Sequence, residues 1–158
     1  MTARPLARAL RAGALAALVA VAACGADDLG PATLDPNNDT CRFCRMSVGD
    51  RRFAAQIVAP GEEPVFFDDL GCLTHYVTGG DPLPPGAVVY VSDHASREWV
   101  RADRAVFTRV ERLDTPMGSG LIAHADAAAR DADPVTREGR PVAVADIVPP
   151  PRPGKAGR

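Results

Sequence analysis

The stretch TCRFCRMSV, residues 40–48, decides how the rest of this sequence is interpreted. Cys41 and Cys44 stand three positions apart, and Met46 follows two positions after the second cysteine. A cysteine pair with this spacing can form a disulfide, supply half of a zinc site, act as a redox pair, or bind a softer metal ion. The remainder of the chain has to distinguish these four kinds of site.

Residues 1–23 have the pattern of a signal peptide. Three arginines precede an apolar run at residues 12–23, about a dozen residues that are too short to span a bilayer. The run ends in VAAC, which resembles a bacterial lipobox and implies cleavage before Cys24 and lipidation of its thiol. The alternative is an ordinary secretory signal with an incidental cysteine. Residues 24–39 are polar and rich in Pro, Asn and Asp, so we predict a flexible tether.

Composition argues against two broad functions. Without the arginines of the signal peptide, the chain carries fifteen basic residues against twenty acidic ones, a net charge of about −5. A nucleic-acid partner is expected to need a basic face, so we predict no nucleic-acid binding. The sequence also contains no nucleophile-elbow, paired-carboxylate or HExxH motif, so we predict that the protein is not an enzyme.

The cysteine count indicates a bound or unpaired thiol. The chain contains four cysteines, and Cys41, Cys44 and Cys72 remain if Cys24 carries a lipid. An odd number of thiols in an exported protein leaves at least one without a disulfide partner. Because that compartment is oxidising, a free thiol kept there needs a reason, and metal binding is one such reason.

Residues 40–148 are expected to form one domain of roughly 110 residues, large enough to bury a core without disulfides. The first half predicts a hairpin, a helix and a strand, at residues 52–59, 65–68, 70–80 and 87–93. The second half repeats this rhythm, at residues 98–110, 121–125, 126–133 and 139–148. These patterns indicate an α+β fold with a possible internal repeat. Residues 149–158 are rich in Pro and Gly and predict a disordered tail.

The methionines favour a soft metal ion. In an extended segment, Cys44 and Met46 would direct both sulfurs to one face, and a thiolate with a thioether selects Cu(I). Apart from Met1, the chain has one further methionine, Met117, and both lie near Gly or Pro in predicted loops. Their sulfurs are therefore candidate ligands, although a partly exposed hydrophobe in a turn is the alternative.

The other three kinds of site stay open on residue patterns alone. A structural zinc site needs four ligands, and no second cysteine pair is present, although Cys72 with one histidine could complete a set. A thioredoxin-type pair is expected at a strand-to-helix turn, whereas this pair precedes the first predicted strand. A disulfide between Cys41 and Cys44 remains possible. Asp68 and Asp69 are predicted to cap the helix at 70–80.

Four blocks of sequence, in this order, resemble one protein family: CRFCRMSVGDRRFAAQIV, FFDDLGCL, SDHASREWVRADRAVF and TPMGSGLIAH. The family is NosL, the accessory lipoproteins of nitrous-oxide reductase, and the resemblance extends over residues 41–147. It implies a small α+β domain made of two related ββαβ-like halves.

For function, the resemblance implies a Cu(I)-binding metallochaperone that is anchored to a membrane through Cys24 and faces the periplasm. Such a protein passes copper to nitrous-oxide reductase or to a similar copper enzyme. The copper ligands of the family carry over onto Cys44, Met46 and Met117. Cys41 and His124 are further candidates that match less firmly.

One position departs from the family pattern. The family commonly has C-x-x-C-G-M, and Arg45 stands here in place of the glycine. If the glycine serves a positive φ, arginine would be strained at this position. The alternative function is an exported thiol-redox or zinc-stabilised lipoprotein that uses Cys41 and Cys44.

Overall fold

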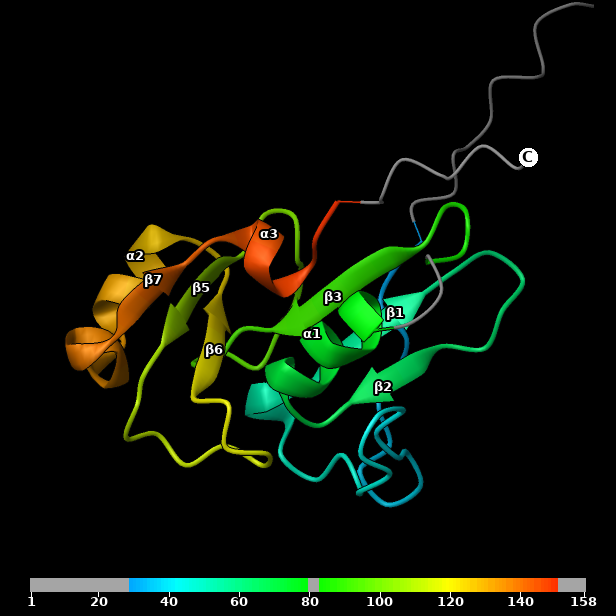
Figure 1. Ribbon diagram of the computed structural model, residues 1–158, viewed down its shortest axis with the longest axis horizontal. Coiled ribbons are helices and arrows are strands. Elements are labelled where there is room, and N and C mark those ends of the chain that lie inside the picture. Colours follow the sequence, from blue (N-terminus) through cyan, green and yellow to red (C-terminus); the bar gives the residue numbers. More distant parts are fainter. Residues whose placement is uncertain (1–28, 80–82, 151–158) are drawn as a thin grey trace, which may run out of the picture.

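The computed structural model describes residues 29–79 and 83–150 (Figure 1). The predicted signal peptide, Cys24 and most of the predicted tail lie outside these ranges. Within them, no helix combines the length and the apolar character needed to cross a membrane.

The first half of the domain forms a four-stranded antiparallel sheet in the order β2-β1-β3-β4. Its strands are β1 (Ala55–Val58), β2 (Val65–Phe67), β3 (Val88–Ser92) and β4 (Trp99–Arg101). A short 3₁₀ helix, η1 (Arg51–Phe53), precedes them. The helix α1 (Leu70–Gly79) follows β2 and packs on this sheet through the buried side chains of Leu70, Cys72 and Leu73.

The second half forms a three-stranded antiparallel sheet in the order β6-β5-β7, which lies beside the first half in Figure 1. Its strands are β5 (Val106–Arg109), β6 (Leu121–His124) and β7 (Arg140–Val142). Three short helices accompany them: α2 (Ala127–Ala132), the 3₁₀ helix η2 (Pro134–Glu138) and α3 (Val144–Ile147).

The predicted α+β class is confirmed, and the two halves share one topology. In each half the first strand lies between the second and the third, and the helical segment connects the second strand to the third. The strand β4 has no counterpart in the second sheet. That the halves are related as a repeat stays a prediction.

One apolar core joins the two halves. Phe67, Leu70 and Leu73 belong to the same buried cluster as Phe107 and Ile147, so neither sheet covers its apolar face alone. The backbone also connects the halves, because the N–H of His94 after β3 donates to the carbonyl of Ala123 in β6 (2.8 Å). The loops that follow β2, β3 and β6 are therefore held in fixed positions relative to one another.

Residues 24–39 were predicted to form a flexible tether, but in the structure residues 29–39 are packed on the domain. The Gln56 amide, buried in β1, accepts a hydrogen bond from the Ala32 N–H (2.7 Å) and donates one to the Ala32 carbonyl (3.1 Å). Leu34 is buried in the main core, and the Tyr90 hydroxyl donates to the Leu29 carbonyl. This segment is held because a buried amide needs partners, and its polar composition gave no sign of that.

The turn before β6 requires glycine at residue 120. Gly118 and Gly120 both have positive φ, at 70° and 66°, and a Cβ on Gly120 would lie 2.6 Å from the Val110 carbonyl oxygen. We expect Gly120→Ala to lower the free energy of unfolding by about 2–4 kcal/mol, because it adds this clash to the cost of a left-handed alanine.

Gly118→Ala is the matched control, because its φ is similar but a Cβ there meets no atom within 4 Å. It should cost only about 1 kcal/mol in urea denaturation. Equal losses in the two variants would show that the Val110 carbonyl moves aside.

Candidate metal centre

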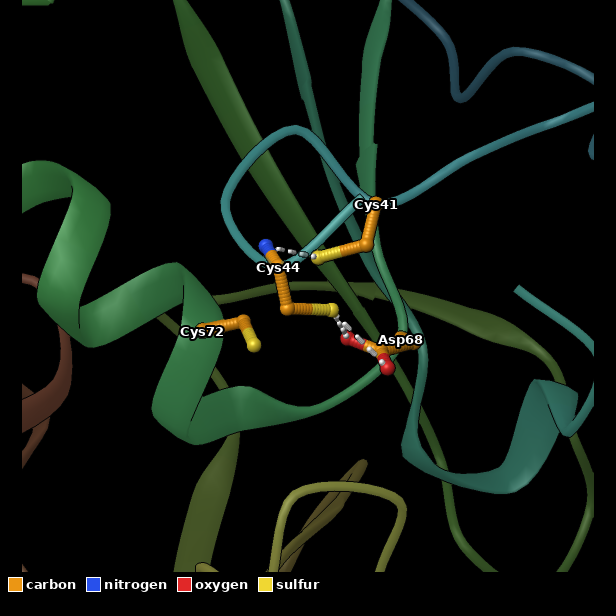
Figure 2. Close-up of side chains that lie close together, drawn as sticks. All are labelled: Cys41, Cys44, Asp68 and Cys72. Atoms are coloured by element: carbon orange, nitrogen blue, oxygen red, sulfur yellow. Dashed lines mark hydrogen bonds between the residues drawn. The ribbon is translucent and has the colours of Figure 1, made fainter. Parts of the chain in front are cut away.

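Three cysteines and one carboxylate converge where β2 ends and α1 begins (Figure 2). Cys41 and Cys44 come from the turn at residues 41–46, Asp68 follows β2, and Cys72 lies in the first turn of α1. One ligand atom from each of the four residues lies within 4.8 Å of those of the others. We call these four residues the thiol cluster.

The turn that carries Cys41 and Cys44 is fixed by its own backbone and by β2. The Cys41 N–H donates to the Met46 carbonyl (2.7 Å), and the Arg45 N–H donates to the Cys41 carbonyl (3.0 Å). The next residue, Arg42, donates its N–H to the carbonyl of Phe66 in β2 (2.8 Å). The two cysteines are thus held against the end of β2 beside Asp68.

Arg45 has the strained conformation that the sequence comparison suggested. Its φ is 69°, in the left-handed region that glycine adopts without cost. A non-glycine residue there costs roughly 1–2 kcal/mol. The tight turn therefore persists with arginine in place of glycine, and the surrounding hydrogen bonds compensate for the strain.

The members of the thiol cluster differ in exposure. Cys41 and Cys72 are buried, whereas Cys44 is half-buried and is the most accessible of the three thiols. The exposed large hydrophobic side chains of residues 29–79 and 83–150 are Phe43, Met46 and Met117, at 48%, 53% and 47%. Phe43 and Met46 lie on either side of Cys44 in sequence, in the same turn as the exposed Arg42 and Arg45.

Asp68 and burial keep the Cys44 thiol protonated. The Cys44 Sγ lies 3.3 Å from each Asp68 carboxylate oxygen and donates to them. Burial, the Cys41 thiol and Asp68 raise the pKa of Cys44 to about 11, although the Met46 N–H opposes this by bonding the sulfur. Burial also raises the pKa of Cys72, and Cys41 and Asp68 raise it further. A cation that binds here must displace these protons, and its charge would then stabilise thiolates beside a carboxylate.

The neighbouring carboxylate connects α1 to the loop that carries Met117. Asp69 accepts the Gly71 N–H of the first helical turn (2.6 Å), the Thr115 hydroxyl (2.6 Å) and the Met117 N–H (3.0 Å). Burial alone would raise the pKa of Asp69, but these bonds and one from Ser119 hold it below its usual range. Met117 is thereby tied to the residue next to Asp68.

The structure brings together some of the predicted site residues and separates others. Cys41 and Cys44 lie in the thiol cluster, and the thioethers of Met46 and Met117 are about half exposed. His124 does not belong to this cluster, because it lies at the end of β6 and its Nε2 lies 3.1 Å from Asp133 Oδ2.

Sequence reasoning underestimated Asp68 and Cys72. Both aspartates were predicted to cap α1, but Asp69 alone does so, while Asp68 bonds the Cys44 sulfur. Cys72 was considered only as a further zinc ligand together with one histidine. The available signal was the spacing of four residues between Asp68 and Cys72. Because one helical turn takes about four residues, side chains just before and just after the first turn of a helix can face the same side.

Comparison with protein-family models matches the NosL family model to residues 31–150, most of the chain. That range includes the thiol cluster and both loop methionines. Neither the curated proteins nor the solved structures gave a match.

Replacing Arg45 with glycine should stabilise the protein. We expect Arg45→Gly to raise the free energy of unfolding by up to about 1 kcal/mol, because relief of the left-handed strain exceeds the entropy that glycine gains on unfolding. Urea denaturation measures this difference. Arg42→Gly, three residues earlier and without a positive φ, should instead be neutral or destabilising. A loss of stability in Arg45→Gly would contradict the strain.

Neutralising Asp68 should make Cys44 more reactive. Burial is the main cause that raises the pKa of Cys44 to about 11, and the bonds to Cys41 and Asp68 add to it, so Asp68→Asn should lower that pKa in part and increase the thiolate fraction at a given pH. At a pH below the pKa, each unit of pKa decrease would raise the thiolate fraction about tenfold, and alkylation would become faster by a smaller factor, because a less basic thiolate is a weaker nucleophile. Mass spectrometry of iodoacetamide adducts over a pH series measures this at Cys44. Asp50→Asn, which removes a carboxylate paired with Arg52, should leave the profile unchanged, and an unaltered profile in Asp68→Asn would contradict the assigned cause.

Proposed function

Because the chain belongs to the NosL family, we propose that it is a Cu(I)-binding accessory protein of the cell envelope that delivers copper to nitrous-oxide reductase or a similar copper enzyme. The observation that carries this proposal is the thiol cluster, in which the buried sulfurs of Cys41 and Cys72 lie within 4.8 Å of the half-buried Cys44 thiol. We further propose that Cys24 is lipidated, that the protein faces the periplasm, and that it binds copper without acting as an enzyme.

The ligand chemistry favours Cu(I) over harder ions. Thiolates and thioethers are soft donors, and Cu(I) prefers them to the oxygen ligands that Mg²⁺ and Ca²⁺ take. In the proposal Cys44 binds as a thiolate, and the exposed thioethers of Met46 and Met117 approach from the surface. The buried sulfurs of Cys41 and Cys72 lie behind Cys44 and offer further soft donors.

Transfer to a client requires that copper be held but remain open to attack. Cys44 meets both conditions, since it contacts Asp68 and Cys41 on its inner side and is partly exposed on its outer side. A ligand of the client could replace a thioether first, because methionine carries no charge and holds its ion less firmly than a thiolate. Because the thioethers are exposed, they can leave the ion without disturbing the core.

Zinc is the second candidate ion, and a specific observation favours it. Cys41, Cys44, Cys72 and Asp68 supply four ligands, which is the number that a closed structural zinc site needs. Such a site would have no use for the exposed thioethers of Met46 and Met117. The two candidates therefore differ in their dependence on methionine.

Cu(I) titration of the full mature chain tests the proposal. Under reducing, anaerobic conditions and against a Cu(I) chelator, the protein should bind about one Cu(I). Cys44→Ala should abolish this binding, and Met46→Leu should weaken it while preserving the apolar volume. Phe43→Leu is the matched control, since it alters an equally exposed side chain in the same turn without removing a donor.

Other outcomes would reject the proposal. Undiminished Cu(I) binding by Cys44→Ala would remove the central ligand. If zinc copurifies, if chelation unfolds the domain, and if Met46→Leu has no effect on binding, the cluster is a structural zinc site.

A further inference from the structure

A second buried cluster lies away from the sulfurs and shares no residue with the thiol cluster. It consists of His94, which follows β3, His124 at the end of β6, and Asp133 between α2 and η2. All three are buried, at 7%, 0% and 8% exposure, and one ligand atom of each lies within 4.8 Å of the others. The copper proposal does not use these residues.

One carboxylate oxygen lies between the two imidazoles. Asp133 Oδ2 is 2.7 Å from His94 Nδ1 and 3.1 Å from His124 Nε2. The other oxygen, Oδ1, accepts the N–H of Val135 (3.0 Å) and is thereby fixed at the start of η2. The outer ring nitrogens, His94 Nε2 and His124 Nδ1, are buried without a partner in the described part of the chain.

We propose that His94, His124 and Asp133 form a second metal site, specific for a divalent transition-metal ion such as Zn²⁺. The ligand atoms would be His94 Nδ1, His124 Nε2 and Asp133 Oδ2. Zinc lies about 2.0–2.2 Å from such nitrogens and oxygens, so ligand atoms about 3 Å apart can contact one ion after small shifts. Two imidazoles and a carboxylate are harder ligands than thiolates and thioethers, so this site would prefer divalent ions, whereas the sulfurs would prefer Cu(I).

The protons balance without an added base. A neutral imidazole carries one proton, and a hydrogen bond to the Asp133 carboxylate requires that proton on the ring nitrogen that faces Asp133, because a carboxylate only accepts. On metal binding that proton moves to the outer nitrogen of the same ring, His94 Nε2 or His124 Nδ1, neither of which has a partner now. Three protein ligands leave one position of a tetrahedral zinc ion for water, as in other sites with two histidines and a carboxylate.

Such an ion would hold the segment from α2 to η2 to the rest of the domain. Neither α2 nor η2 contains a buried residue, and the apolar cluster beside them has only Phe53, Val110 and Ile122 as buried members. Besides Val135, which packs partly buried on that apolar cluster, the segment from α2 to η2 is held to the loop after β3 and to β6 through Asp133. A metal bond at that residue would connect three parts of the chain, as structural metals do where an apolar core is small.

The reduced full mature chain can be titrated with Zn²⁺ and followed by NMR of the histidine ring nitrogens. His94 and His124 should shift together and saturate, whereas His75, which stacks on Phe43 outside this cluster, should not follow them. Zinc bound by the thiol cluster would be seen at His75, which lies in α1 with Cys72 and stacks on Phe43, and the residue-specific signals separate that event from zinc at His94 and His124. If neither His94 nor His124 responds, or if both respond only in parallel with His75, the proposal is wrong.

Variants provide a second readout. His124→Asn should weaken zinc binding at His94 by more than about tenfold, and zinc should no longer raise its melting temperature to the extent seen in wild type. His75→Asn is the matched control and should behave as wild type. Circular dichroism without metal establishes that His124→Asn is folded. If it is not, the wild-type NMR titration decides the question alone.

The two proposals fail separately. Loss of Cu(I) binding in Cys44→Ala should leave the zinc response of His94 and His124 intact. Conversely, His124→Asn should bind Cu(I) as wild type does, because the two clusters share no ligand.

Discussion

The structure depends on the burial of two adjacent carboxylates at the junction of β2 and α1. A buried carboxylate is costly unless hydrogen bonds satisfy it, and this chain satisfies each of the two in a different way. Asp69 accepts hydrogen bonds from N–H and O–H groups. One of these bonds caps the start of α1, and the others fix the loop that carries Met117. Asp68 instead faces a sulfur, and its bonds depend on Cys44 retaining a proton. One junction thus determines both the position of the surface loop and the protonation of the thiol.

Much of the fold was predictable, because its elements carry their own patterns. The hairpin of β1 and β2, the helix α1 and the strand β3 follow from short β-branched runs and glycine boundaries. The fixed segment at residues 29–39 was not predictable, since it is held by Gln56, a polar side chain of a distant strand. A hydrogen bond between a side-chain amide and a distant backbone does not alter the hydrophobic periodicity of either segment.

The candidate sites show the same division. The spacing of Cys41 and Cys44 brought them together locally, whereas Cys72 joins them through tertiary packing. His124, a candidate ligand from the family resemblance, lies with His94 and Asp133 and not with the sulfurs. Its partner Asp133 reaches it through the short turn between α2 and η2, a contact that residue type alone does not specify. A left-handed Arg45 was raised only as a condition, from the glycine that the NosL family commonly has at this position, and the φ of 69° meets that condition.

The fixed segment before β1 also limits how far the domain can move. If Cys24 carries a lipid, the chain has only residues 24–28 between the membrane and the first residues packed on the sheet. Five residues extend at most about 17 Å, less than the diameter of a small domain. Such a domain would stay next to the bilayer surface and could not reach partners far from it. Copper would then be exchanged within a thin layer next to the membrane, where a short linker gives a partner in the same layer a high effective concentration.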